Sequence, residues 1–142
     1  MANAIINGKK VEFQPGMTIL QAARAANIYI PVLCEHPALE IAGACRVCLV
    51  EVENNPKLQT ACSTPIMDGM VIDSNTEKVR AARKAVIELL LIRHPLDCFS
   101  CSSNGKCGLQ AIAYDLGIEK SPFWEEGDTC KMMMDLKNGT DR

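Results

Sequence analysis

The chain has 142 residues, 48% of them apolar and 4% aromatic, and its formal net charge is −2 at pH 7. This length suits one domain, or a small domain with an appendage. The balanced charge, without a basic stripe, argues against nucleic acid as a partner, and no apolar run reaches the roughly 18 residues of a membrane span. Because eight cysteines occur without an apolar secretory signal, we predict a reducing, cytoplasmic location and metal binding rather than disulfides.

The first half of the chain predicts an α+β unit. Residues 4–13 are typical of a β-hairpin, because alternating apolar residues flank Asn7-Gly8, a favoured two-residue turn. Thr18 is a candidate N-cap for a helix with an apolar face of Ile19, Leu20, Ala22, Ala23 and Ala26. The elements expected next are an extended segment at 28–33, a loop at 34–45 and strands at 46–52, 57–62 and 70–73.

The second half is predicted to be helical. Ser74 and Glu77 match a capping box, which predicts a helix that runs to about Arg93 and ends before Pro95. The apolar residues with helical spacing in this segment are Val79, Ala82, Val86, Leu89, Leu90 and Ile92. A cysteine-rich loop and a short helix at 108–116 follow, with Gly117 as its stop signal. Residues 120–142 show no period and are predicted to form an irregular tail, a candidate docking segment.

The first four cysteines have the spacing C-x10-C-x2-C-x13-C and are Cys34, Cys45, Cys48 and Cys62. A plant-type [2Fe–2S] centre likewise takes three thiolates from one loop and one from further along, although its first gap is shorter. Ala42, Gly43 and Ala44 are small enough to let backbone N–H groups approach the sulfurs. The alternatives are structural zinc, whose tetrathiolate sites usually contain two C-x2-C pairs, and buried cysteines that bind no metal. His36 is interpreted as a hydrogen-bonding neighbour and not as a ligand.

A second set has the spacing H-x3-C-x2-C-x5-C and comprises His94, Cys98, Cys101 and Cys107. Three thiolates leave one position of a [4Fe–4S] cluster to be filled. From the residues alone, the fourth ligand could be His94, the distant Cys130, or none. A histidine at this place is also explained as a cation at a helix C-terminus, where the helix dipole favours positive charge.

Three segments together are distinctive, namely GACRVCLVEVE, ACSTP around Cys62, and HPLDCFSCSSNGKCGLQ. Through them the chain resembles, over roughly residues 3–124, the N-terminal region of the 75-kDa subunit of respiratory complex I. It resembles equally the corresponding region of iron-only hydrogenases and NAD(P)-dependent formate dehydrogenases.

This resemblance implies a β-grasp [2Fe–2S] ferredoxin-type domain at 1–75, a small helical [4Fe–4S] domain at 76–119, and the tail at 120–142. It implies one cluster of each type. The implied ligands of the [2Fe–2S] cluster are Cys34, Cys45, Cys48 and Cys62. The implied ligands of the [4Fe–4S] cluster are His94, Cys98, Cys101 and Cys107.

The end of the chain departs from the family pattern. Relatives usually continue into a ferredoxin-like domain, whose first ligand would fall at Cys130, but Met133 stands at the next ligand position. Cys130 is therefore interpreted as a thiol without ligand partners, with a reactive or intermolecular thiol as the alternative. A hydrogen-activating or formate-oxidising centre would then lie on another chain.

We predict no catalytic residues, since the sequence contains no acid–base constellation, no G-x-G-x-x-G after a strand and no P-loop. The predicted function is an electron-transfer subunit of a soluble multi-subunit oxidoreductase, placed between a flavin- and NAD(P)-binding iron–sulfur subunit and another redox subunit. The implied hosts are an electron-bifurcating hydrogenase, a formate dehydrogenase or a transhydrogenase. The alternatives are a free-standing ferredoxin shuttle and an interaction module in which the metal is structural.

Overall fold

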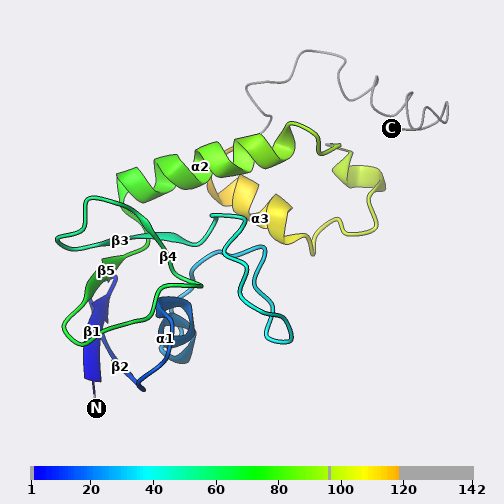
Figure 1. Ribbon diagram of the computed structural model, residues 1–142. Coiled ribbons are helices and arrows are strands. Elements are labelled where there is room, and N and C mark those ends of the chain that lie inside the picture. Colours follow the sequence, from blue (N-terminus) through cyan, green and yellow to red (C-terminus); the bar gives the residue numbers. More distant parts are fainter. Residues whose placement is uncertain (1, 96, 119–142) are drawn as a thin grey trace. The chain divides into compact units, whose positions relative to one another are not determined.

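The fold is described from a computed structural model for residues 2–95 and 97–118 (Figure 1). The chain separates into two compact units, Met1–Val86 and Ile87–Arg142, and the division falls within helix α2 (Glu77–Leu91). The predicted domain boundaries after residues 75 and 119 stay predictions. The predicted tail, with Cys130, lies outside the described residues.

The first unit is built on a five-stranded mixed sheet with the strand order β2-β1-β5-β3-β4. Its strands are β1 (Ala2–Ile6), β2 (Lys9–Phe13), β3 (Leu49–Val52), β4 (Gln59–Thr60) and β5 (Val71–Asp73). β1 and β5 pair in parallel at the centre, and the other pairs are antiparallel. With α1 (Ile19–Ala25) between β2 and β3 in the chain, this is the predicted β-grasp topology.

The N-terminal hairpin forms as the sequence predicts. Ile6 pairs with Lys9, and both turn residues have positive φ, 51° at Asn7 and 77° at Gly8. Such angles match the twist of the two strands they join. The alternation buries Ala4, Ile6, Val11 and Phe13, which enter the core of the first unit.

Helix α1 begins at the predicted cap. The Thr18 hydroxyl accepts the N–H of Gln21, and the Gln21 side chain accepts the N–H of Thr18, so the two form a capping box. The helix buries Ile19, Leu20, Ala22 and Ala23 in the same core. Hydrophobic burial therefore fixes α1 beside the sheet.

The two strands next to the cysteines are shorter than predicted. β3 begins at Leu49 and not at residue 46, because Arg46 has a φ of 60° and the chain turns through Val47 and Cys48. β4 contains only Gln59 and Thr60, after which the chain turns again. Cys48 and Cys62 thus lie just outside the strands that position them.

The predicted capping box at Ser74 is wrong. Thr76 caps α2 instead, since its hydroxyl accepts the N–H of Val79 at 3.2 Å. The N–H of Ser74 donates to the Asn7 side chain at 2.8 Å, and the Ser74 hydroxyl bonds to the same side chain. Ser74, the predicted cap, is therefore hydrogen-bonded to the hairpin turn and does not cap α2.

In the second unit, α2 ends at Leu91, about half a turn before the predicted end. A short 3₁₀ helix, η1 (Cys98–Ser100), and α3 (Gly108–Asp115) follow. Gly117, with φ 67°, ends α3, and Ile118 donates to the Ala113 carbonyl, as in a Schellman motif. Along the last turns of α2, Ile87 and Leu91 are buried, whereas Leu89 and Leu90, and Ile92 just after the helix, remain exposed. None of the helices in the described part of the chain is long and apolar enough to cross a membrane.

Candidate metal centres

Pairing of β3 with β4 brings Cys48 and Cys62 together. Leu49 faces Thr60 in the register, and the N–H of Ala61 donates to the Cys48 carbonyl at 3.0 Å. Cys48 directly precedes β3, and one residue, Ala61, separates Cys62 from the end of β4. Both side chains are 1% exposed. Half of the first ligand set is therefore held inside the core of the β-grasp unit.

Cys34 and Cys45 come from the two ends of the loop between α1 and β3. The N–H of Cys45 donates to the Cys34 sulfur at 3.5 Å, so the loop closes on itself. Gly43, with φ 59°, lies against Ser63, the residue after Cys62. The loop therefore runs beside the segment that carries the fourth cysteine, and all four predicted ligands come from neighbouring positions.

Helix α1 supports the same region through its first turn. The N–H of Leu20 donates to the Ala61 carbonyl at 2.9 Å, and the N–H of Ile19 donates to the Thr64 carbonyl at 3.0 Å. The first N–H groups of a helix have no partner within it, and here they hold the residues on either side of Cys62. Arg24 of α1 also pairs with Glu35, next to Cys34, at 2.6 Å.

The thiols of the first set are within electrostatic reach of one another. Burial, and after it the neighbouring thiols of Cys48, Cys34 and Cys45, together raise the pKa of Cys62 to about 12. At Cys45 burial also raises the pKa, but backbone hydrogen bonds at Val47, Leu33 and Cys34 outweigh it and leave the pKa below its usual value. Hydrogen bonds that favour a thiolate in this way are those that a metal–thiolate centre uses.

His36 takes the role expected for a neighbour of the first set. Its Nδ1 accepts the N–H of Ala38 at 3.2 Å, and its carbonyl accepts the N–H of Leu39. The imidazole therefore stabilises a turn within the loop, and His36 is a hydrogen-bonding residue, as predicted.

The second set is built on consecutive turns. The N–H of His94 donates to Leu91, and the N–H of Cys101 donates to Cys98, each at 3.2 Å. A polar turn then reverses the chain: the Gln110 side chain accepts the N–H of Gly105 and donates to Asn104. This returns Cys107 to the first position before α3, where its carbonyl accepts the N–H of Ala111.

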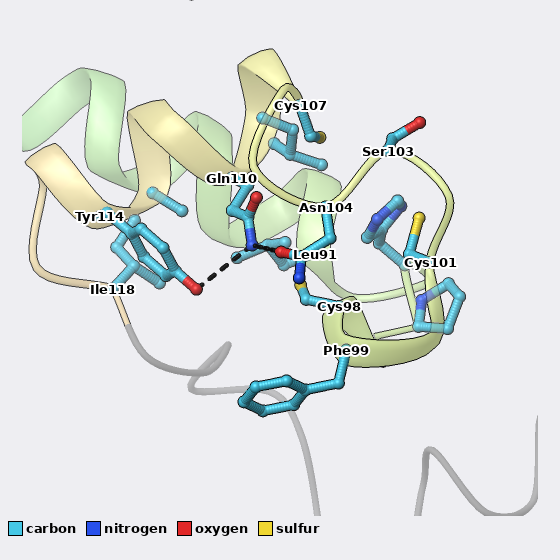
Figure 2. A pocket seen from close by; sticks show the side chains of 14 residues that line it. Leu91, Cys98, Phe99, Cys101, Ser103, Asn104, Cys107, Gln110, Tyr114 and Ile118 are labelled. Atoms are coloured by element: carbon cyan, nitrogen blue, oxygen red, sulfur yellow. Dashed lines mark hydrogen bonds between the residues drawn. The ribbon is translucent and has the colours of Figure 1, made fainter.

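All four residues of the second set line one cavity of about 180 Å³, together with Leu91, Leu109 and Ala113. Figure 2 shows Cys98, Cys101 and Cys107 around this cavity, with Phe99 projecting away from them. Phe99 is 100% exposed. The volume is several times the roughly 30 Å³ of one water molecule, so the cavity has room for a group larger than a single ion.

The chemistry of both sets fits iron–sulfur clusters better than zinc. Zinc needs four ligands within about 2.3 Å of one point. A [2Fe–2S] cluster instead spreads its thiolates over two irons. Thiolate donors, burial of Cys48 and Cys62, and the cavity of the second set all suit such polynuclear groups.

A sheet that gathers four thiols, followed by a cavity lined by three thiols and an imidazole, is the arrangement of an iron–sulfur protein. Comparison with known families agrees with this. The family described as "2Fe-2S iron-sulfur cluster binding domain" matches residues 2–77, and the chain belongs to this family. Residues 83–122 match the family described as "NADH-ubiquinone oxidoreductase-G iron-sulfur binding region".

The chain is similar to subunits of NADH-ubiquinone oxidoreductases. The chain is 46% identical over 125 residues to the NADH-ubiquinone oxidoreductase 75 kDa subunit of Reclinomonas americana, and these cover 88% of the chain and 18% of that subunit. It is 43% identical over 120 residues to the mitochondrial NADH-ubiquinone oxidoreductase 78 kDa subunit of Candida albicans, covering 84% of the chain and 17% of that protein. The chain thus spans less than a fifth of the length of these relatives, and the predicted resemblance is confirmed.

A solved structure shows the same fold. A chain of an NAD⁺-reducing [NiFe]-hydrogenase in the H₂-reduced state matches with a TM-score of 0.78 and 35% identity, covering 88% of this chain and 54% of that one. The fold of this chain therefore occurs also in a chain of an NAD⁺-reducing [NiFe]-hydrogenase, whereas the hydrogenases named from the sequence were iron-only.

The sequence interpretation missed one residue near the first set. Arg83 is buried and donates hydrogen bonds to the backbone on either side of Cys48. The sequence did contain a signal for this residue: Arg83 lies four residues from both Val79 and Ile87, on the otherwise apolar face of the predicted helix.

Proposed function

We propose that the chain carries electrons through two clusters, one [2Fe–2S] and one [4Fe–4S]. Cys34, Cys45, Cys48 and Cys62 are the proposed ligands of the first, and His94, Cys98, Cys101 and Cys107 are those of the second. The observation that supports this best is that the members of each set lie close together. In the first set, the buried Cys48 and Cys62 interact electrostatically with Cys34 and Cys45 of the adjoining loop, and the second set surrounds one cavity. The assignment of His94 as the fourth ligand is supported by its place in the lining of the same cavity as the three thiols.

The bound clusters would accept and release electrons one at a time, and the chain would supply ligation, orientation and insulation. At the first site, burial of Cys48 and Cys62 excludes water from part of the ligand shell. Backbone hydrogen bonds at Cys45 favour its thiolate. Hydrogen bonds to sulfur and solvent exposure are among the features that set cluster potentials, so the two sites should differ in potential.

The proposed place of the chain is a relay in a multi-subunit oxidoreductase. Its relatives are subunits of NADH-ubiquinone oxidoreductases, and the similar structure is an NAD⁺-reducing hydrogenase. These support a flavin- and NAD(P)-binding subunit on one side and another redox subunit on the other. Hydrogenases, formate dehydrogenases and transhydrogenases of the electron-bifurcating type are the hosts we propose.

Metal and sulfide analysis of protein purified without oxygen tests the cluster assignment. We expect about six iron atoms and six acid-labile sulfides per chain, the sum of one two-iron and one four-iron cluster. Dithionite should give two paramagnetic signals. One or two zinc ions per chain, without sulfide and without a reducible signal, would contradict the proposal and support a structural metal.

Reduction of the clusters by NADH or NADPH tests the proposed place of the chain in the electron-transfer complex. In the complex purified with its partner subunits, NADH or NADPH should reduce both clusters, whereas the chain alone should not respond. A complex whose clusters stay oxidised under NADH and NADPH, yet are reduced by dithionite, would contradict the proposed place between a nicotinamide-oxidising subunit and a second redox subunit.

A further inference from the structure

Arg83 is a buried cation that holds the backbone around Cys48. The side chain is 3% exposed. Its Nε donates to the Val47 carbonyl at 2.8 Å, and its terminal nitrogen donates to the Leu49 carbonyl at 3.0 Å. The same nitrogen donates to the Ser74 carbonyl at 3.2 Å. The guanidinium therefore bridges the two carbonyls that flank a proposed ligand of the first cluster.

The end of β5 explains why these carbonyls need a donor. Glu51 faces Asp73 in the β3–β5 pairing, so the same register would bring Leu49 opposite Asn75. The chain has left the sheet by then, and the N–H of Asn75 donates to the Asp73 side chain at 2.9 Å. A buried carbonyl without a partner costs about as much as a lost hydrogen bond. Arg83 thus continues the hydrogen bonding of the sheet where β5 has ended.

Binding of the Val47 carbonyl also fixes the N–H of Cys48. The two groups belong to one planar trans peptide, so they point in opposite directions. The N–H of Cys48 is held on the side of the strand away from Arg83. The Cys48 carbonyl accepts from Ala61 on that same side, next to Cys62. Arg83 therefore sets the direction of a peptide group whose N–H points to the side on which Ala61, the neighbour of Cys62, lies.

The charge of Arg83 has a second consequence. Reduction adds one negative charge to a cluster, and a nearby cation favours that state, more strongly where water is excluded. A hydrogen bond from a charged donor also polarises the peptide it binds, which strengthens the opposite N–H as a donor. Both effects act in the same direction on a centre that contains Cys48, because both stabilise added negative charge.

We propose that Arg83 is a positioning residue of the first cluster, which orients the Cys48 peptide and raises the reduction potential of that cluster. This inference rests on the proposed function, since it requires a [2Fe–2S] centre at Cys34, Cys45, Cys48 and Cys62. Arg83 does not ligate iron in this account. It acts through the Val47 and Leu49 carbonyls and through its charge.

The test compares Arg83→Met, Arg83→Lys and Lys84→Met in the full chain, loaded with clusters without oxygen. Arg83→Met removes the charge and the hydrogen bonds, whereas Arg83→Lys keeps the charge and loses the two-nitrogen geometry. Lys84→Met removes one charge from an exposed position of the same helix. Redox titration followed by electron paramagnetic resonance gives the potential and g values of each cluster.

We expect the one-electron reduction constant of the first cluster to fall at least tenfold in Arg83→Met, which is about 59 mV. The shift should be smaller in Arg83→Lys, with altered g values in both. Lys84→Met should match the wild type at the first cluster. The second cluster should keep its potential in all three variants, so it serves as the internal reference.

Wild-type potential and g values at the first cluster in the Arg83 variants would overturn the inference. If Arg83→Met fails to assemble the first cluster, Arg83→Lys decides, and an unchanged potential and g values there overturn it equally. An equal shift in Lys84→Met would overturn it too, because net charge on the helix would then suffice. A wild-type chain without a reducible two-iron centre would instead overturn the proposed function.

Discussion

The two ligand sets are held in opposite ways. The first set is brought together by contacts between distant parts of the chain. The β3–β4 pairing places Cys48 beside Cys62, and helix α1 donates hydrogen bonds to the residues around Cys62. A hydrogen bond between Cys45 and Cys34 closes the loop that carries the other two cysteines. The second lies within a short stretch of chain, on turns around one cavity, and its members His94 and Cys101 are exposed. The first site is therefore a product of the fold, whereas the second depends on local turns and on what it binds.

The largest expected effect is the loss of one cluster without the other. Cys62→Ala removes a buried ligand, so the first cluster should be absent and the iron content should fall from about six to about four per chain. Ser63→Ala, at the next and exposed residue, is the matched control and should keep about six. Iron and sulfide counts with paramagnetic resonance measure this. Loss of both clusters in Cys62→Ala would show that the two sites do not assemble independently.

The second prediction concerns the ligand that distinguishes the sites. Removing even an outer hydrogen-bond partner of a metal ligand weakens binding about 10- to 100-fold, so His94→Ala should lose most of its four-iron cluster. His94→Cys should retain the cluster and lower its potential by roughly 100 mV, because a thiolate adds negative charge. Redox titration measures the change.

The other histidine supplies the control for that experiment. His36→Ala should leave the second cluster unchanged, since this imidazole accepts the N–H of Ala38 in the loop of the first set. An unaltered four-iron signal in His94→Ala would contradict the assignment of His94 and direct attention to another ligand.

The third prediction uses the difference in burial. An iron chelator reaches exposed ligands more readily than buried ones, so the second cluster should be removed at least about tenfold faster than the first. Paramagnetic signals followed over time, in the chain alone, give both rates. Equal rates would mean that the burial of Cys48 and Cys62 does not protect the first site.

The smallest effect is expected from a pair of glycines, one in each ligand loop. Gly43 and Gly105 both have positive φ, 59° and 79°, so an alanine at either position should cost about 1 kcal/mol. A Cβ at Gly43 would lie 3.6 Å from the Ser63 hydroxyl, an ordinary contact, and one at Gly105 would meet nothing within 4 Å. The cost therefore comes from the backbone angle alone.

The two glycine variants should differ in what they weaken. Gly43→Ala should lower the free energy of unfolding of the β-grasp unit, measured by denaturant titration. Gly105→Ala should leave that quantity unchanged and speed the loss of the second cluster instead. A lowered unfolding free energy in Gly105→Ala would show that the second ligand loop contributes to the stability of the first unit.

Turns and helix ends that depend on one or two neighbouring residues could be predicted from the sequence. The turn at Asn7-Gly8, the Thr18 cap and the stop at Gly117 follow from the preferences of single residues, and the structure confirms each. The composition of the two candidate sites follows in the same way, because the spacing of cysteines is visible in the sequence. The ligand assignments themselves stay predictions.

Features that depend on distant contacts could not be predicted. Ser74 carries the signal of a helix cap, but the hairpin turn at Asn7 binds it and Thr76 caps α2 instead. The role of Arg83 depends on the residue at which β5 ends, which no local pattern encodes. The unequal exposure of the two sets is likewise a result of packing, since cysteines make up all of the first set and three of the four residues of the second.

Mössbauer spectra of protein enriched in ⁵⁷Fe, prepared without oxygen, test the central claim most directly. The account predicts two cluster species, with about one third of the iron in a [2Fe–2S] centre and about two thirds in a [4Fe–4S] centre. Cys62→Ala should remove the first species and His94→Ala the second. Iron in a single species, or iron bound without sulfide, would contradict the account.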